Sequence, residues 1–389
     1  MPRIPVAIPH LGEEEAEAAR RVILSGWVTQ GPEVAAFERE FAAYVGAAQA
    51  CAVSNCTTAL HLALLAAGVG EGDEVITVSH SFIATANAIV YCRARPVFVD
   101  IGPDGFNIDP DRIEAAITPR TRAILCVHQL GMPCDLAAIV PIARRHGLCL
   151  IEDAACAVGS EIAWNGEWQK IGRPHGDIAC FSFHPRKVIT TGDGGMLTTN
   201  DPALDARFRL WRQHGMSVPD SVRHSAETVT FESYEEVGFN YRMTDLQAAI
   251  GRVQLQRLDG IVAARRERAA LYGELLGNVA AIGVPDEPTW ARSNWQSYCV
   301  TLAPDLDQRA IMQALLDEGI ATRRGVMNAH LETPYAGQGR DLVRSEAAQA
   351  RSIILPLHDR MPEADIERVA TALITAIGTT RPSLERAFG

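Results

Sequence analysis

Short apolar runs alternate with segments of helical period between about residues 50 and 200. The runs are rich in Val, Ile, Leu and Cys and show little polar alternation, which is typical of strands buried on both faces of a mostly parallel sheet. The segments between them are typical of helices that cross over the faces of such a sheet. The pattern predicts strands at Ala50–Ser54, Glu74–Val78, Pro96–Asp100, Ala123–His128, Cys149–Glu152, Ile178–Phe183 and Met196–Thr199, and helices near Thr57–Ala67, Ala84–Cys92, Pro110–Ile117 and Leu136–His146.

The remainder of the chain changes character. A long helical pattern runs from Asp245 to about Leu276, and beyond Pro285 a strand-like segment and two further helices follow, at Tyr298–Leu302, Gln308–Glu318 and Ala364–Ile377. A chain of 389 residues exceeds the size at which one core stops growing. We therefore expect an α/β protein with a large domain over residues 1–250 and a smaller C-terminal α+β domain over residues 251–389.

Composition narrows the classes of partner. The formal net charge of −11 argues against nucleic acid or a membrane surface, because both bind basic protein faces. An anionic ligand would need a local positive pocket. The first residues, Met1 to Pro9, lack the features of a signal peptide, and no apolar stretch reaches the roughly 18 residues of a membrane span. These observations predict a cytoplasmic protein.

The nine cysteines form no C-x-x-C pair, so the sequence supports neither a disulfide framework nor a zinc site. Cys51, Cys126, Cys149 and Cys180 stand inside apolar runs, where reduced thiols pack as small hydrophobic groups. His80, His128 and His184 have no metal-ligand spacing, and we predict no metal site.

The segment with the most chemical information runs from Ser182 to Gly195, SFHPRKVITTGDGG. It places Lys187 between a predicted strand and a glycine-rich turn whose backbone can approach a ligand closely. A lysine at such a position is often only a solvated surface cation. A lysine buried beside a cofactor can instead lose its proton and form a Schiff base.

Two further strand ends carry polar residues. One strand ends in two carboxylates, Glu152 and Asp153. Either both are simply solvated at a turn, or Asp153 pairs with a pyridinium nitrogen. Thr57 and Thr58 follow another strand, at the start of a predicted helix. The free backbone N–H groups at a helix start can bind a phosphate, but small polar residues there are equally typical of an ordinary N-cap. Because parallel strands end at one edge of a sheet, both groups are expected near Lys187.

Together these motifs resemble the DegT/DnrJ/EryC1/StrS family of aminotransferases that depend on pyridoxal phosphate (PLP), from about Ile4 to Ile377. The resemblance rests on SGWVTQG at Ser25–Gly31, GDEVI at Gly72–Ile76, PVFVD at Pro96–Asp100, EDAA at Glu152–Ala155, the Lys187 segment, and GFNYRM at Gly238–Met243. It implies the PLP fold-type I architecture, with a mixed, mostly parallel seven-stranded sheet, a small C-terminal domain, and a homodimer with shared active sites.

The resemblance also implies roles for individual residues. Lys187 becomes the Schiff-base lysine, Asp153 the partner of the pyridinium nitrogen, and Phe82 the aromatic ring stacked on the cofactor. Thr57, Thr58 and Ser182 become phosphate ligands, and Asn240 is expected to reach the phosphate of the neighbouring subunit. Cys56, Asp193 and Cys156 depart from the family pattern. Cys156 replaces a glutamine or histidine beside the cofactor ring, and a thiol is a much weaker hydrogen-bonding group.

The implied activity is amino transfer. Glutamate or glutamine would convert PLP to pyridoxamine phosphate, which then aminates a keto group of a nucleotide-linked sugar, with the released Lys187 moving the proton. A cyclitol or keto-ring substrate, and a PLP-binding regulator without turnover, remain alternatives. Trp27, Arg242, Arg324 and His330 are candidate substrate-binding residues, of which the last three would supply positive charge for a diphosphate, although arginines such as Arg323 and Arg324 are as often solvated.

Overall fold

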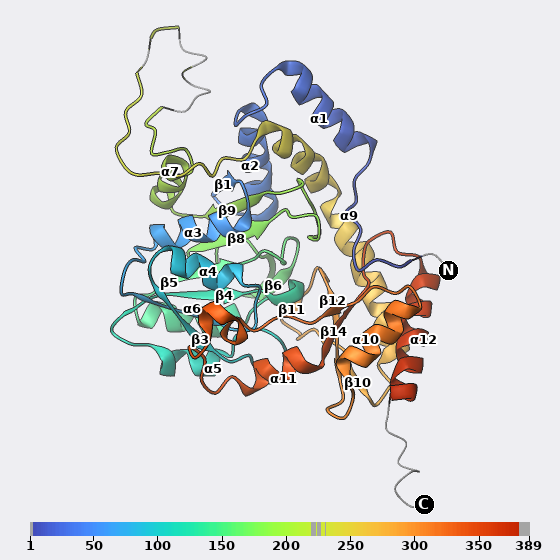
Figure 1. Cartoon of the computed structure of the whole chain (residues 1–389). Coiled ribbons are helices and arrows are strands. Elements are labelled where there is room, and N and C mark those ends of the chain that lie inside the picture. The colour runs from blue at the N-terminus through green and yellow to red at the C-terminus, as the bar shows by residue number, and fades with distance from the viewer. Residues whose placement is uncertain (1–2, 219–222, 224–226, 230, 381–389) are drawn as a thin grey trace, which may run out of the picture.

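A seven-stranded sheet forms the centre of the computed structural model, which describes residues 3–218, 223, 227–229 and 231–380 (Figure 1). The strand order is β1-β9-β8-β5-β4-β2-β3. β9 runs antiparallel to both of its neighbours, and the other strands share one direction. The strands are β1 (Gln49–Val53), β2 (Glu74–Val78), β3 (Arg95–Val99), β4 (Thr121–Val127), β5 (Cys149–Asp153), β8 (Ile178–Ser182) and β9 (Gly195–Thr199). The predicted mostly parallel sheet is confirmed, with each strand displaced by two residues at most.

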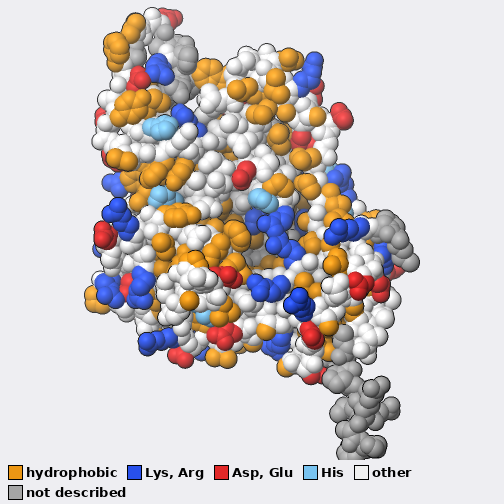
Figure 2. Space-filling view, viewed as in Figure 1, with side chains coloured by type: hydrophobic (Ala, Val, Ile, Leu, Met, Phe, Trp, Pro, Cys, Tyr) orange, Lys and Arg blue, Asp and Glu red, His pale blue; other side chains and the backbone are white. Residues whose placement is uncertain are grey.

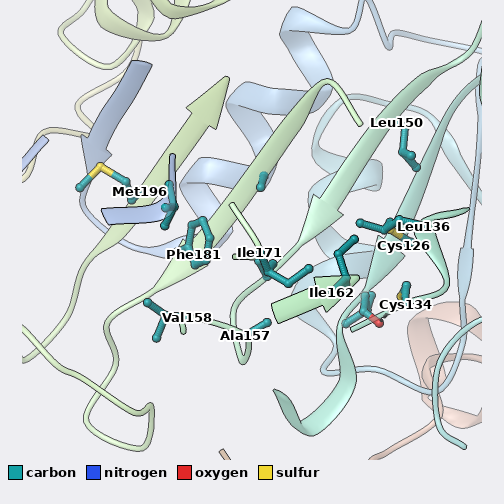
Figure 3. Packing of buried hydrophobic residues seen from close by; sticks show 14 of the residues in the cluster. Cys126, Cys134, Leu136, Leu150, Ala157, Val158, Ile162, Ile171, Phe181 and Met196 are labelled. Atoms are coloured by element: carbon teal, nitrogen blue, oxygen red, sulfur yellow. Dashed lines mark hydrogen bonds between the residues drawn. The ribbon is translucent and has the colours of Figure 1, made fainter. Parts of the chain in front are cut away.

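Helices cover both faces of this sheet. Alternate strand residues enter two separate hydrophobic clusters, because successive side chains of a strand point to opposite faces. One cluster joins the sheet to α2 (Pro32–Val45), α6 (Leu136–Arg145) and α9 (Asp245–Leu276), and the other joins it to α3 (Cys56–Ala66), α4 (Ala84–Tyr91) and α7 (Pro202–Trp211). In Figure 3, Phe181 and Met196 lie on neighbouring strands, and Val158, Ile162 and Ile171 belong to the same cluster. Burial on both faces explains the unbroken apolar runs of the sequence.

The C-terminal part of the chain builds a second, smaller layer around its own core. An antiparallel sheet of order β10-β12-β14-β13 combines β10 (Ile282–Gly283), β12 (Tyr298–Leu302), β14 (Ser352–Leu355) and β13 (Arg323–Arg324). α10 (Gln308–Asp317) and α12 (Glu363–Thr380) pack with it, and Figure 1 shows this part in orange and red. α9 bridges the two parts, since Val262 belongs to the large core and Ala269 to the small one. The domain boundary at residues 250 and 251 stays a prediction.

Several elements lie outside the sequence-based assignment. α1 (Glu13–Ser25) and α2 precede the first strand, and β6 (Glu161–Trp164), β7 (Glu167–Lys170) and β11 (Ala291–Arg292) form a third small sheet. The helix expected at Pro110–Ile117 is split into α5 (Pro110–Ile113) and the 3-10 turn η1 (Glu114–Ala116). The other short elements are η2 (Gln129–Gly131), η3 (Ala329–Leu331), η4 (Thr333–Tyr335) and α11 (Val343–Arg351). Among the described residues, every helix is too short or too polar to cross a membrane.

Candidate active site

The carboxyl ends of the parallel strands bring the predicted chemical residues together. Asp153 ends β5, Ser182 ends β8, and Asn55 to Thr58 follow β1 into α3. Asp153 pairs with Cys180 in β8, while Ser182, Gly195 and Val53 lie side by side across three strands. Residues that are more than a hundred positions apart in the sequence therefore share one edge of the sheet, as open α/β sheets require of a ligand site.

Lys187 stands in the turn after β8, and its side chain returns toward β5. The Nζ atom lies 3.1 Å from the Sγ atom of Cys156, and the side chain is half-buried. Burial disfavours the charged ammonium, but the Cys156 sulfur, with Cys56 and Asp153, holds the pKa of Lys187 above its ordinary value. Lys187 thus lies close to two sulfur atoms and one carboxylate rather than on the open surface.

Asp153 is buried at the base of the same site. Its Oδ2 atom accepts a hydrogen bond of 2.8 Å from the Thr85 hydroxyl, and its Oδ1 atom accepts one of 3.2 Å from the Ala155 N–H. Burial raises the pKa of Asp153, whereas these two donors and Lys187 favour the ionised form. A carboxylate held in this way can face a cationic ring nitrogen.

A relay of hydroxyl groups behind Asp153 was not found by sequence reasoning. The Thr85 hydroxyl uses its single hydrogen in the bond that it donates to Asp153. The Ser81 hydroxyl, whose oxygen lies 2.8 Å from that of Thr85, must therefore be the donor in the bond between these two residues. Both hydroxyls are buried. Phe82 lies between these two residues in the chain and is 65% exposed, so its ring is available for a ligand. The signal in the sequence was the presence of Ser81 and Thr85 shortly after β2. From this segment, sequence reasoning selected only Phe82.

The start of α3 forms a cradle of backbone N–H groups. Asn55 caps the helix: its Oδ1 atom accepts from the Thr58 N–H at 2.9 Å, and the Thr58 hydroxyl donates to the Asn55 carbonyl at 2.7 Å. The Thr58 side chain is therefore engaged in capping. Among the described residues we find no acceptor for the N–H groups of Cys56 and Thr57. These two donors and the helix dipole suit a phosphate.

Gly195 lets β9 approach this cradle closely. A Cβ atom at Gly195 would lie 2.4 Å from the carbonyl carbon of Asn55, which no side chain could tolerate. Ser182, the cross-strand neighbour of Gly195, accepts a hydrogen bond of 3.4 Å from the His184 N–H and lies next to the cradle. The glycine-rich turn after Lys187 thus ends at a residue that allows β9 to pack directly against the start of α3.

The segment that carries Asn240 and Arg242 runs beside the same cradle. The Tyr241 carbonyl accepts a hydrogen bond of 2.7 Å from the Ser54 N–H, and Arg242 forms a bridge with Val53. Asn240 is exposed. Trp27 stands in the turn before α2, where its indole N–H donates to the Gln30 carbonyl at 3.2 Å. Their predicted ligand roles stay predictions.

His330 and Arg324 lie in different surroundings. His330 is buried and joins β2 to the C-terminal part, with Nδ1 2.7 Å from the Ser79 hydroxyl and Nε2 3.3 Å from Glu346. Arg324 is exposed on β13. Their assignment to the substrate also stays a prediction. Figure 2 shows Lys and Arg side chains gathered beside a hollow near the centre of the visible face, whereas acidic side chains are scattered.

Sulfur and histidine chemistry adds no second site. All nine cysteines are free thiols, and Cys51, Cys126 and Cys180 are fully buried as predicted, whereas Cys149 is only partly buried. In the part of the chain that the structure describes, no group of three or more His, Cys, Asp or Glu side chains could hold a metal ion. Another residue that the sequence did not indicate is Asn294, which donates to the carbonyls of Cys156 and Val158, both at 2.8 Å.

Comparison with known proteins agrees with this geometry. The model of the DegT/DnrJ/EryC1/StrS aminotransferase family matches residues 9–374. The chain is 42% identical over 378 residues to GDP-perosamine synthase of Caulobacter vibrioides, covering 96% of this chain and 98% of that protein. It is 38% identical to the spore coat polysaccharide biosynthesis protein SpsC of Bacillus subtilis, covering 95% and 96% of the two chains.

Solved structures give the same result. The aminotransferase TlmJ of Streptoalloteichus hindustanus superposes with a TM-score of 0.89 at 35% identity, over 97% of this chain and 99% of that one. DesV of S. venezuelae gives 0.88 at 35% identity, over 96% and 98%. Lys187, Asp153 and the α3 cradle fit PLP, which is the cofactor of this enzyme class. The chain belongs to the DegT/DnrJ/EryC1/StrS aminotransferase family and is a PLP-dependent aminotransferase.

Proposed function

We propose that this aminotransferase moves an amino group from glutamate or glutamine to a keto group of a nucleotide-linked sugar. The observation that carries the proposal is that Lys187, in contact with Cys156, and buried Asp153 lie at one sheet edge and influence each other's charge, beside a free phosphate cradle. The nucleotide-linked substrate is supported by the similarity to a protein named GDP-perosamine synthase, at 42% identity over nearly the whole chain.

Asp153 supplies a fixed negative charge. When bound, PLP supplies a conjugated ring that accepts electrons from the substrate carbon, provided that its ring nitrogen stays protonated. The Asp153 carboxylate would hold that proton at the ring nitrogen, and the Thr85 and Ala155 donors keep the carboxylate ionised and oriented. Phe82 would cover one face of the ring, since its side chain is exposed and it lies in the chain between Ser81 and Thr85, the hydroxyl residues behind Asp153.

Lys187 performs two tasks in this scheme. Its amine would hold the cofactor between reactions, and once released it would carry a proton between the substrate carbon that bears the amino group and the cofactor carbon to which the lysine had been bonded. The amine must be neutral to accept a proton. The pKa of Lys187 is above its ordinary value in the protein alone, because of the nearby Cys156 sulfur and Asp153 carboxylate. Neutralisation of Asp153 by a cationic ring would remove part of that effect.

The phosphate would bind at the start of α3, on the N–H groups of Cys56 and Thr57 and the hydroxyls of Thr57 and Ser182. The Thr58 hydroxyl is already engaged with Asn55, so we give it a supporting role in shaping the helix start. Anchoring through the phosphate would hold the cofactor in place whenever its bond to Lys187 is broken, as every amino transfer requires.

The test begins with the cofactor. Borohydride reduction of the purified protein should fix the cofactor to the peptide that contains Lys187, as seen by mass spectrometry. Attachment to another lysine would contradict the assignment. Turnover is then measured as release of 2-oxoglutarate from glutamate in the presence of nucleotide-linked keto-sugars, with cyclitol ketones as the comparison. Labelling at Lys187 without turnover on either substrate class would favour a regulator.

The proposal includes a homodimer in the cytoplasm. The part of the chain between α7 and α9 that the structure describes extends away from the body of the molecule at the upper left of Figure 1. It exposes Val229, Phe231 and Val237 by 86 to 88% each. Such apolar exposure marks a surface that another protein covers, and a second copy of the chain is the occupant that the family resemblance implies. Nine free thiols suit a reducing compartment.

A further inference from the structure

A hollow of about 600 Å³ lies on the small domain, between the N-terminal segment, α10 and β13. Its volume is within the range of about 300–1,000 Å³ that small-molecule sites occupy. None of the residues that line it belongs to the cofactor site described above. The hollow is therefore a separate feature of the molecule.

Three arginines from three segments meet there. Arg3 is brought in by the bridge between Ile4 and Ile320, Arg309 stands in the first turn of α10, and Arg324 lies on β13. Directly opposed residues of paired strands point to the same face of a sheet. Arg324 is opposite Ile353, which is buried in the small-domain core.

The neighbouring Arg323 is opposite Ile354 and outside the hollow. Arg324 and Arg323 thus point to opposite faces of one sheet, and only Arg324 faces α10. The two residues form a matched pair for mutagenesis. Both are exposed arginines of the same strand, but their side chains point to opposite faces of the sheet.

Among the described residues, no carboxylate forms an ion pair with the three guanidinium groups. None of the lining residues is acidic, and among the described residues none of the recorded ion pairs involves Arg3, Arg309 or Arg324. Two acids at the ends of α10 are engaged elsewhere: Asp307 caps the helix and Asp317 accepts from Gln313 at 2.7 Å. Three positive charges placed close together repel one another, which favours the binding of an anion between them. This local positive charge contrasts with the net charge of −11 of the whole chain.

We propose that this hollow is a second binding site, for an organic phosphate of the nucleoside diphosphate class. Arginine binds phosphate oxygens in pairs through its planar fork, and three such groups suit a diphosphate. Met312 and Leu316 line the same hollow and offer an apolar surface to a base or sugar ring, while Gln308 and Gln313 add amide groups. The proposal does not depend on the substrate assigned to the cofactor site.

The experiment uses the holoenzyme after borohydride reduction, so that the cofactor occupies its own phosphate cradle. Inorganic pyrophosphate and GDP are titrated by isothermal calorimetry at low salt. Both should bind the wild type. The double variant Arg309→Gln/Arg324→Gln should raise the Kd of pyrophosphate about tenfold or more. The matched control Arg323→Gln should leave that Kd within about twofold, because its side chain faces away.

Further measurements complete the test. Unchanged thermal unfolding and cofactor absorbance show that the variants are folded. GDP should bind the hollow more tightly than pyrophosphate, since Met312 and Leu316 contact its organic part. Absence of binding to the wild type would overturn the proposal. So would a loss of binding in Arg323→Gln with none in the double variant, because the anion would then sit on the opposite face. Pyrophosphate binding as tight as that of GDP would overturn the organic part of the assignment.

Discussion

The hydroxyl of Thr85 is the residue-scale feature that most directly affects the chemistry of Asp153. It donates a hydrogen bond of 2.8 Å to a carboxylate whose pKa is raised by burial. In Thr85→Val the shape is kept but the donor is lost, so the ionised form of Asp153 is less stabilised and its pKa rises further. The acidic limb of kcat/KM should therefore move to higher pH, with kcat lowered about tenfold at neutral pH. An unchanged pH profile would show that Thr85 only fills space; Ser81→Ala, one bond further away, serves as the weaker control.

Cys156 offers a second prediction at this scale. Its thiol lies 3.1 Å from Lys187 Nζ, at a position where the family resemblance leads us to expect glutamine or histidine. Glutamine can also accept a hydrogen bond from the lysine, so Cys156→Gln should retain kcat within about threefold and keep the cofactor bound. Steady-state kinetics and the absorbance of the cofactor provide the measurement. A collapse of activity in a folded, cofactor-loaded variant would mean that the thiol itself has a specific function.

At the scale of elements, Glu74 fixes the register of three strands. It begins β2, and its carboxylate accepts hydrogen bonds from Arg95 on β3 at 2.6 Å, from Thr118 at 2.7 Å and from Arg120 Nε at 3.0 Å. Although burial opposes it, this set of donors lowers the pKa of Glu74 to about 2. Because the pKa in the folded state lies below that of the unfolded chain, the stability gained is present above about pH 4.5 and is lost as the pH falls toward 2.

Glu74→Gln should therefore reduce the free energy of unfolding at pH 7 by roughly 1–2 kcal/mol, a modest value because both arginines are more than half exposed. Urea denaturation at a series of pH values provides the measurement. The difference between wild type and variant should shrink between pH 4.5 and 2. A difference that stays constant over this range would exclude the charge of Glu74 as its origin.

The elements also show how far the sequence alone could lead. Apolar runs predicted the central strands closely because burial on both faces leaves few polar positions before the strand end, as in β5 and β8, whose polar residues stand only at their carboxyl ends. The hairpin of β6 and β7 was missed, although Asn165 and Gly166 both have the positive φ of a two-residue turn and an Asn-Gly pair is its usual signal. α2 was also missed, despite buried residues at Val34, Phe37 and Phe41 with helical spacing.

The site divides in the same way. Lys187 and Asp153 could be proposed from the sequence because Asp153 stands at the end of a strand and Lys187 shortly after one, and parallel strands end at one edge. The contact between Lys187 and Cys156 could not be predicted, because it requires β5 and β8 to be neighbours in the sheet. Local sequence patterns do not determine the order of strands in a sheet. The position of Arg324 likewise depends on the face of β13 to which it points, which is set by the register with β14.

At the scale of the whole molecule, the segment before α9 would connect the proposed dimer to the active site. It carries the exposed apolar residues Val229, Phe231 and Val237, and it continues into Asn240, which is exposed beside the start of α3. If a second copy covers this segment, a two-fold axis makes the exchange reciprocal, and each phosphate cradle would receive Asn240 from the other subunit. Neither chain would then be active alone.

Subunit exchange between two inactive variants tests this arrangement. Lys187→Ala and Asn240→Ala are purified separately and mixed under conditions in which the subunits exchange. Random mixing makes about half of the dimers hybrid, and if Asn240 acts across the interface, each hybrid contains one site with both residues intact and one with neither. Activity should then recover to roughly a quarter of the wild-type value. If Asn240 serves its own chain, each site in the hybrid keeps one defect and nothing recovers. Two controls make the result decisive: Asn240→Ala alone must be clearly impaired, and capture of a tagged subunit must show that exchange took place.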